Sequence, residues 1–153
     1  MTYQEYKNAR QKEVGDLPLK WAFGNEQFKE MMNEWGLKED EYDKIGTIGA
    51  GGYYLKKDRD IIIAFFTKPS DLKKLMRDKK FAIEAFEYEM ANHEYAINYQ
   101  GDWDVCNCFS SKELEFEEGK GYTEYLTEAK YPKYVIEYYE EARKNYIQYD
   151  LSH

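Results

Sequence analysis

The sequence predicts an α+β fold: a helix-dominated single domain with a small β-hairpin or a two- to three-stranded sheet. Apolar residues recur at helical spacing in several long segments. Four of the ten glycines fall within residues 46–52, between two short apolar stretches, as in a hairpin turn. The chain has 153 residues and no segment rich in Pro, Gly or Ser that would separate two domains. We therefore expect one domain over residues 1–153.

Two helices are predicted at the N-terminal end of the chain. The sequence Thr2-Tyr-Gln-Glu5 has the spacing of a capping box, so a helix should begin there and run to about Val14. Asn25 is expected to cap the second helix and Gly36 to end it. The inner face of that second helix should carry Phe28, Met31, Met32 and Trp35.

The glycine cluster lies in the segment KIGTIGAGGYYLKK, residues 44–57, and it lacks the parts of a phosphate-binding loop. A Walker loop requires a lysine and a hydroxyl residue directly after its last glycine, but Gly52 is followed by Tyr53. The dinucleotide-binding fingerprint requires a third glycine where this chain has Tyr54. Neither kind of phosphate site is therefore predicted.

The same cluster predicts a β-hairpin. Residues 45–48 and 53–55 would form its strands, with the turn at or near Ala50-Gly51. We expect a positive φ at Gly51 or Gly52, because glycine adopts it without steric cost. In an alternative interpretation, backbone amides form a nest that binds an anion or a carboxylate. The binding residues would then be Gly51, Gly52 and Tyr53.

The middle of the chain contains one ambiguous segment and one clear helix. Residues 61–66, IIIAFF, fit a helix capped by Asp58 or Asp60, but their β-branched residues also suit a strand. Ser70 is expected to cap a short helix over DLKKLMRD. Residues 79–98 have the strongest helical pattern. Its apolar stripe comprises Ile83, Phe86, Met90, His93 and Ile97.

Residues 102–130 give conflicting signals. Ser110-Ser-Lys-Glu113 has capping-box spacing, whereas ELEFEE alternates like a strand, so both interpretations stay open. Pro132 suits the first turn of a last helix. One face of that helix should carry Val135, Tyr138, Ala142, Tyr146 and Tyr149.

The charge is unevenly distributed along the chain, whose formal net charge is −8. Residues 56–80 carry nine basic and four acidic side chains, whereas residues 81–128 carry two basic and twelve acidic ones. This contrast fits two solvated faces or a charge-patterned binding surface. The candidate acidic binding residues are Glu113, Glu115, Glu117 and Glu118. The candidate basic ones are Lys73, Lys74 and Arg77.

No catalytic or metal-binding pattern is predicted. His93 and Glu94 begin a zinc-protease motif, but Ile97 stands where the second histidine is required. His93 is instead expected to be buried and hydrogen-bonded in the core. Cys106 and Cys108 could join His93 as soft ligands, but three ligands make a poor structural zinc site, so we expect free thiols. We predict no cofactor, no metal and no enzymatic activity.

The sequence predicts a cytoplasmic protein. It contains no apolar run long enough to span a membrane, and its N-terminal segment is polar, unlike a signal peptide. Two cysteines two residues apart fit a reducing compartment. The acidic net charge disfavours direct nucleic-acid binding.

Three stretches of the chain resemble a family of small uncharacterised proteins encoded by phages, prophages and other mobile elements. They are TYQEYKNARQKEV, WAFGNEQFKEMM, and DKIGTIGAGGYYLKK with YEMANHEYAIN after it. The shared features are Ala22-Phe23, Gln27-Phe28, the glycines of residues 49–52 and the helix over residues 88–95. The resemblance covers roughly residues 1–98. It implies accessory genes whose products act in a host bacterial cell, many of which counter host defence, and it carries over no catalytic residue.

Three functions follow as hypotheses. The leading one is a protein that binds and inhibits a bacterial defence protein by occlusion, through an acidic, tyrosine-rich surface. The chain contains sixteen tyrosines that could contribute to such a surface. The alternative is a sponge that sequesters a nucleotide immune signal, with aromatic rings stacking the base and basic residues holding phosphates. A small enzyme using His93 is a third. The oligomeric state stays open, although a binding protein of this size is often a homodimer.

Overall fold

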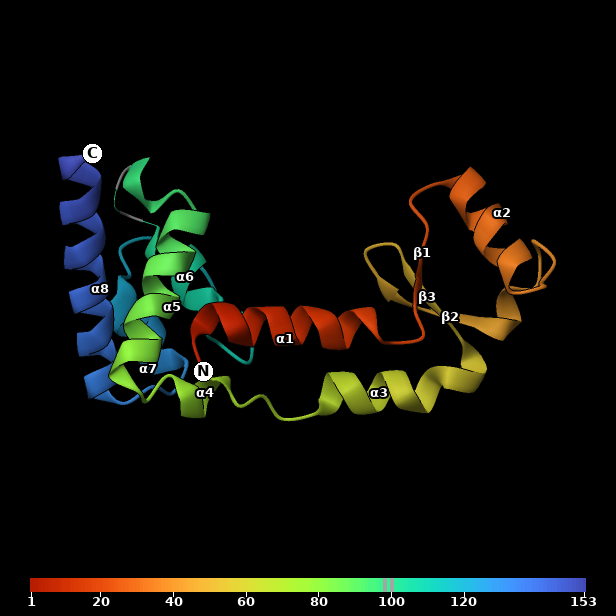
Figure 1. Ribbon diagram of the computed structural model, residues 1–153, viewed down its shortest axis with the longest axis horizontal. Coiled ribbons are helices and arrows are strands. Elements are labelled where there is room, and N and C mark those ends of the chain that lie inside the picture. The colour runs from red at the N-terminus through yellow and green to blue at the C-terminus, as the bar shows by residue number, and fades with distance from the viewer. Residues whose placement is uncertain (98, 100) are drawn as a thin grey trace. The chain divides into compact units, whose positions relative to one another are not determined.

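The computed structural model describes residues 1–97, 99 and 101–153 and confirms the predicted class, an α+β fold dominated by helices with one small antiparallel sheet (Figure 1). The chain divides into two compact units. We call Met1–Lys7 with Ser70–His153 the helical unit, and Asn8–Pro69 the sheet unit. The sequence predicted one domain without this division. The boundary between Lys7 and Asn8 lies within helix α1 (Tyr3–Gly15). No change in composition therefore marks it in the sequence.

The helical unit contains the longest helices. α5 and α8 run side by side, and α6 and α7 pack against them and against each other (Figure 1). Its elements are the start of α1, then α4 (Leu72–Leu75), α5 (Lys79–Asn92), the 3₁₀ helix η3 (Tyr95–Ile97), α6 (Asp102–Asn107), α7 (Tyr122–Glu128) and α8 (Lys133–Ser152).

The core of the helical unit is aromatic. Phe86 of α5 packs edge-on against both Phe109 and Tyr139, with ring centroids 4.9 Å apart in each pair. Tyr3 joins this core from the other end of the chain. The buried tyrosines are Tyr3, Tyr95, Tyr125, Tyr131 and Tyr139. The protein supplies partners for buried hydroxyls, as it does for Tyr131, whose hydroxyl donates to the Phe109 carbonyl.

One polar network lies within this core. The Tyr95 and Tyr139 hydroxyls both donate to Oδ1 of Asp102, at 2.8 and 2.7 Å. Arg143 donates from Nε to the Tyr95 hydroxyl at 2.9 Å. The network joins η3, α6 and α8, so it fixes three elements to one carboxylate.

The sheet unit is built on three strands in the order β1-β3-β2, all antiparallel to their neighbours. The strands are β1 (Lys20–Trp21), β2 (Ile45–Gly49) and β3 (Gly52–Leu55), accompanied by α2 (Asn25–Glu34), η1 (Tyr42–Lys44), η2 (Lys56–Asp58) and α3 (Arg59–Thr67). Met31 and Met32 of α2 meet Ala22 and Ile45 in a small separate core. The inner face predicted for α2 is therefore confirmed at both methionines.

The predicted hairpin over the glycine cluster is confirmed. Ala50 and Gly51 both have positive φ, 51° and 84°, as a tight turn between right-twisted strands requires. The register shifts between Thr47 and Gly49, where the Thr47 hydroxyl donates to the Gly52 carbonyl at 2.8 Å. Gly51 meets the prediction of a positive φ, and Gly52 instead lies in β3.

Substitutions in this turn are expected to act in opposite directions. Gly51→Val should lower the free energy of unfolding by about 2 kcal/mol, because the residue needs a positive φ and a Cβ there would lie 2.5 Å from the Phe23 ring. Ala50→Gly should raise it by about 0.5 kcal/mol, because glycine relieves the left-handed strain of alanine. Urea unfolding followed by tryptophan fluorescence measures both. Equal destabilisation by the two variants would contradict the turn geometry.

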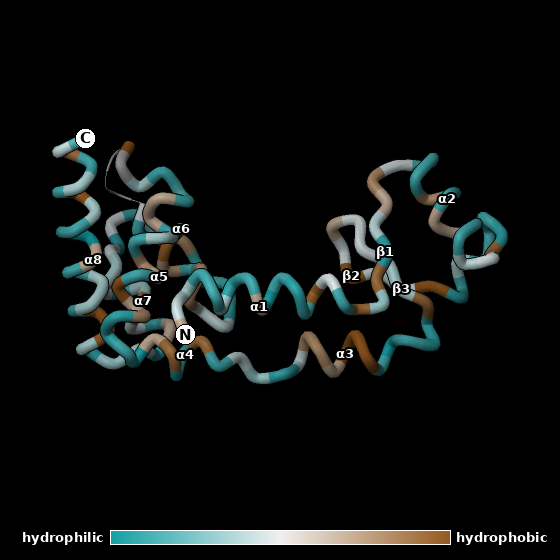
Figure 2. The backbone as a smooth tube through the Cα atoms, viewed as in Figure 1, coloured by the Kyte–Doolittle hydropathy of each residue, from teal (hydrophilic) through white to brown (hydrophobic). Residues whose placement is uncertain are grey.

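The helix predictions before residue 80 hold with small changes. Thr2 accepts the Glu5 backbone N–H at 3.1 Å, as the capping box requires. Gly24, not Asn25, is the N-cap of α2. The ambiguous segment over residues 61–66 is helical in α3, which is hydrophobic along most of its length (Figure 2). Ser70 accepts the Leu72 N–H at 3.1 Å, but the N-cap of α4 is Asp71, one residue later than predicted.

The helix predicted over residues 79–98 ends six residues early, at Asn92. Glu94 takes a positive φ of 53°, which stops the helix and directs Tyr95 into the core. His93 is therefore the C-cap and is exposed, so the prediction of a buried core histidine is wrong. Ile97 is also exposed, and the prediction for residue 98 lies outside the described residues.

Two further predictions are corrected in the C-terminal third. Residues 113–117 form neither a helix nor a strand but an irregular segment between α6 and α7. α8 buries Val135, Ile136, Tyr139 and Ala142, so Val135 and Ala142 are confirmed and Tyr139 is the fully buried ring. Tyr138 and Tyr146 pack against the core only in part, and Tyr149 is exposed.

Candidate functional site

The acidic side chains singled out from the sequence lie together on the irregular segment between α6 and α7. Glu113, Glu115, Glu117 and Glu118 are all exposed. Leu114 is buried between them, and its backbone is held at both ends. Its N–H donates to the Asn107 side chain at 2.8 Å, and its carbonyl accepts from the Trp103 indole at 2.8 Å.

The same segment presents one aromatic ring among the acidic groups. Phe116 has 65% of its surface exposed and touches Trp103 edge-on, at a centroid distance of 6.1 Å. The Tyr125 hydroxyl bonds both backbone groups of Glu117, at 3.3 and 3.1 Å. Lys120 pairs with Glu117 at 2.8 Å and also with Glu128. The segment is irregular yet fixed, so its side chains are presented in a defined arrangement. We call residues 113–118 the acidic segment.

The predicted basic residues lie at α4. Lys74 and Arg77 are exposed, whereas Lys73 is half-buried with its ammonium 5.4 Å from the centre of the Tyr131 ring. Tyr131 is itself buried, and its hydroxyl donates to the Phe109 carbonyl at 2.6 Å. The ring therefore serves the core and offers no open face on which a base could stack.

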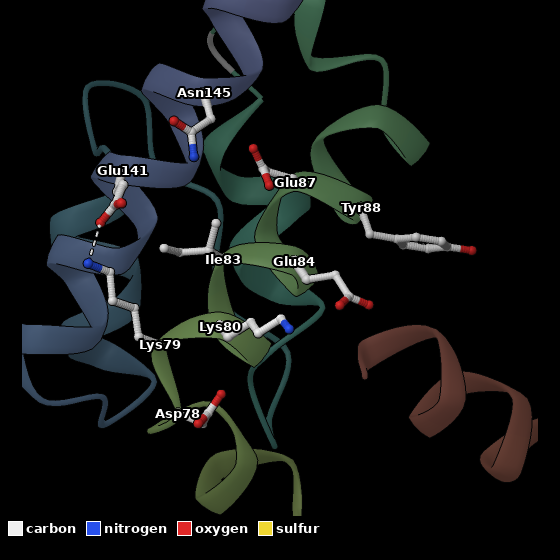
Figure 3. Close-up of a pocket in the computed structure, with 9 residues that line it drawn as sticks. All are labelled: Asp78, Lys79, Lys80, Ile83, Glu84, Glu87, Tyr88, Glu141 and Asn145. Carbon is white, nitrogen blue, oxygen red and sulfur yellow. Dashed lines mark ion pairs between the residues drawn. The ribbon is translucent and has the colours of Figure 1, made fainter. Parts of the chain in front are cut away.

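A shallow groove runs between α5 and α8 (Figure 3). Lys79 and Glu141 form an ion pair across it, with Nζ and Oε2 3.2 Å apart. Ile83 points toward α8, whereas Tyr88 projects from α5 on the side away from α8 (Figure 3). The charged side chains lining the groove are acidic at Asp78, Glu84, Glu87 and Glu141 and basic at Lys79 and Lys80. This excess of carboxylates disfavours a phosphate-bearing ligand.

The residues of the predicted amide nest belong to the hairpin of the sheet unit. The Gly51 carbonyl accepts the Ala22 N–H at 2.9 Å, and Gly52 pairs with Trp21 on one side and Gly49 on the other. Tyr53 packs edge-on against Phe28. These contacts account for Gly51, Gly52 and Tyr53 by folding alone. They lie in a different unit from the acidic segment and the basic residues of α4.

A family match covers most of the chain. The family of unknown function DUF7659 matches residues 2–119. The chain belongs to this family. No curated protein and no solved structure gives a significant match. The DUF7659 region ends directly after the acidic segment, so α7 and α8 lie beyond it although α8 completes the core of the helical unit.

Within the DUF7659 region, three side chains that could bind a metal converge. Glu89 of α5, His93 at its end and Cys108 after α6 offer ligand atoms that all lie within 4.8 Å of one another. The Cys108 Sγ and the His93 Nε2 are 3.3 Å apart. Glu89 is buried, His93 exposed and Cys108 half-buried, so the group lies at the surface with one side in the core.

From the sequence, His93 and Cys108 were recognised as possible ligands, and Glu89 was not. Glu89 and His93 are four residues apart and so share a helix face, which was a visible signal. Cys106, the other candidate ligand, is fully buried, with its pKa raised by that burial. Only the fold decides which cysteine meets His93.

The electrostatics of the group disfavour a thiolate nucleophile. Burial, and next the charge of Glu89, raises the pKa of the Cys108 thiol to about 12. At neutral pH the thiol is therefore protonated, and it donates to the Asp104 carbonyl at 3.3 Å. A catalytic cysteine needs the opposite shift. Cys108 as a nucleophile therefore does not support the hypothesis of an enzyme that uses His93.

Among the described residues, no helix combines the length and the apolar character needed to cross a membrane.

Proposed function

We propose that this chain is a phage- or mobile-element-encoded accessory protein that binds and inhibits a bacterial defence protein by occlusion. The observation that carries the proposal is the acidic segment, in which an exposed Phe116 stands among four exposed glutamates on a fixed backbone. The mobile-element context rests on the resemblance described above. The proposed surface is acidic and carries Phe116 as its exposed aromatic anchor.

The fixed backbone lowers the cost of binding. The hydrogen bonds of Leu114 and Glu117 order the segment before any partner arrives. Preorganisation of this kind avoids about 0.5–1.5 kcal/mol for each side chain that would otherwise be immobilised on binding. Phe116 is the natural anchor, because large rings that are desolvated at the centre of an interface contribute most of its energy.

The charge of the segment indicates the chemistry of the partner. Four carboxylates around one ring suit a basic groove with an apolar pocket, such as the nucleic-acid channel of a defence nuclease. Such carboxylates steer association more than they hold the complex together. A protein bound in such a channel would exclude the nucleic acid.

The proposal predicts a salt-dependent association rate that depends on the acidic segment. The test variant changes four glutamates to glutamine: Glu113, Glu115, Glu117 and Glu118. At salt concentrations below ~0.15 M, where the Debye length reaches about 8 Å, this variant should associate about tenfold or more slowly than the wild type. Its dissociation rate should change less. Phe116→Ser should mainly speed dissociation. The partner is obtained by affinity purification from carrier cells, and both rates are measured with purified proteins.

A matched variant separates the segment from net charge. It neutralises the exposed Glu26, Glu30, Glu39 and Asp40 of the sheet unit and therefore changes the net charge by the same amount. We expect it to bind at nearly the wild-type rate. If both quadruple variants slow association equally, the acidic segment is only a solvated surface.

The alternative, a sponge for a nucleotide immune signal, makes the opposite prediction in the same assay. Calorimetric titration with a panel of cyclic nucleotides should then show binding that is lost when Lys73, Lys74 and Arg77 are changed to alanine. The acidic-segment variant would bind nucleotide as the wild type does.

A further inference from the structure

We propose that Glu89, His93 and Cys108 bind a divalent transition-metal ion, best matched by Zn²⁺, with a fourth coordination position facing solvent. This inference is independent of the acidic segment and of any partner. Among the described residues, this is the one group of three or more His, Cys, Asp and Glu side chains whose ligand atoms converge to metal-binding distance.

The spacing of the ligand atoms fits tetrahedral coordination. With Zn–S near ~2.3 Å and Zn–N near ~2.0 Å, a sulfur and a nitrogen on one ion lie roughly 3.5 Å apart. The Cys108 Sγ and His93 Nε2 are 3.3 Å apart, and Glu89 lies within the same 4.8 Å limit. Only small side-chain movements are needed to place one ion between the three atoms.

The kinds of donor atom select the metal. A thiolate, an imidazole and a carboxylate together suit a borderline-soft ion, whereas Ca²⁺ and Mg²⁺ require oxygen ligands. Zn²⁺ sites with three protein ligands leave a fourth position for water or another molecule. Here His93 is exposed, so the ion would be open to solvent on that side.

Two contacts must be given up when the ion binds: the ion pair of Lys7 with Glu89, and the hydrogen bond from Cys108 to the Asp104 carbonyl. Lys7 lies 3.5 Å from Oε1 of Glu89, and its charge neutralises that buried carboxylate in the metal-free protein. Its side chain is 39% exposed, so it can turn to solvent when the ion takes over. The Cys108 thiol must release one proton to solvent as the S–Zn bond forms, and with it the hydrogen bond to the Asp104 carbonyl.

The experiment measures metal binding by the full chain after chelator treatment. Zn²⁺ is titrated by calorimetry, and Co²⁺ is used as a spectroscopic probe. We expect one ion per chain, release of about one proton, a thiolate-to-cobalt charge-transfer band, and a higher Tm in the presence of Zn²⁺. Cys108→Ser and His93→Gln should each weaken binding about 100-fold, and Cys108→Ser should abolish the band.

Two control variants make the test specific. Cys106→Ala removes the neighbouring, buried cysteine and should leave the charge-transfer band intact. Lys7→Met removes the competing cation and should tighten Zn²⁺ binding roughly tenfold. Circular dichroism shows whether each variant folds, and His93→Gln changes an exposed side chain, so it tests the site even if Cys108→Ser misfolds. The proposal is overturned if the wild-type chain binds no Co²⁺. It is also overturned if the charge-transfer band persists in the Cys108→Ser variant.

Discussion

Raising the pH above about 10 is expected to unfold the helical unit cooperatively. The pKa values of Tyr3, Tyr95, Tyr131 and Tyr139 are all raised, in each case chiefly by burial. Each buried tyrosine lowers the free energy of unfolding by about 1.4 kcal/mol per pH unit above its unfolded pKa, so four lower it by up to about 5 kcal/mol per unit.

The sign follows from where the protons are bound. An unfolded tyrosine loses its proton near pH 10, whereas the folded chain keeps it to higher pH. Between those two pKa values the folded state holds more protons than the unfolded state, so stability falls as the pH rises. Below pH 10 both states are protonated and this stabilisation is complete. Cys106, whose pKa is also raised by burial, starts the decline nearer ~8.5, the pKa of a free thiol.

Far-ultraviolet circular dichroism and tyrosinate absorbance, recorded together from pH 8 to 12, measure this transition. Loss of helix should coincide with ionisation of the buried tyrosines. Tyr139→Phe should reduce the pH slope of the free energy of unfolding by about one proton, whereas Tyr134→Phe, which changes an exposed ring, should not alter it. Gradual ionisation of every tyrosine near pH 10 with the helices intact would contradict the prediction.

Asp102→Ala is expected to lower the free energy of unfolding by about 3 kcal/mol. Oδ1 of Asp102 accepts hydrogen bonds from Tyr95 and Tyr139, both of which are buried. Removing the carboxylate leaves two buried hydroxyls without this acceptor, and each such loss costs about 1–3 kcal/mol. It also unlinks α6 from η3 and α8.

The neighbouring Asp104→Ala provides the matched control. Asp104 lies in the same helix, but it is exposed, so its removal should change the free energy of unfolding by less than about 0.5 kcal/mol. A second test adds Tyr139→Phe to Asp102→Ala. Because both residues belong to one hydrogen bond, the double variant should be less destabilised than the sum of the two singles. The prediction fails if Asp102→Ala costs no more stability than Asp104→Ala. It also fails if the effects of Asp102→Ala and Tyr139→Phe on the free energy of unfolding add fully in the double variant.

The elements that sequence reasoning predicted correctly are those whose signals are local. The capping box at Thr2 places its donor and acceptor three residues apart, and the structure forms that bond. The hairpin at Ala50-Gly51 depends on φ values that only a few residue types adopt readily, so the glycine cluster located it. For the candidate site, the same kind of signal identified the acidic segment by composition, but not its irregular backbone.

Where local signals were ambiguous or wrong, distant contacts decided the structure. The pattern over residues 79–98 is helical throughout, yet the helix ends at Asn92, and Tyr95 turns inward to bond Asp102. The acidic segment could have been a helix or a strand by its sequence. It is neither, because Asn107, Trp103 and Tyr125 bind its backbone groups.

The sequence by itself determined the fold class, the start of the first helix, the hairpin and the concentration of acidic side chains. Only the tertiary structure decided that residues 1–7 join a unit that otherwise begins at Ser70, and that Cys108 rather than Cys106 meets His93 and Glu89. Both results depend on contacts between residues far apart in the chain. Propensities and short-range spacings contain no information about such contacts, because the free energy that selects them comes from burying side chains supplied by several elements at once.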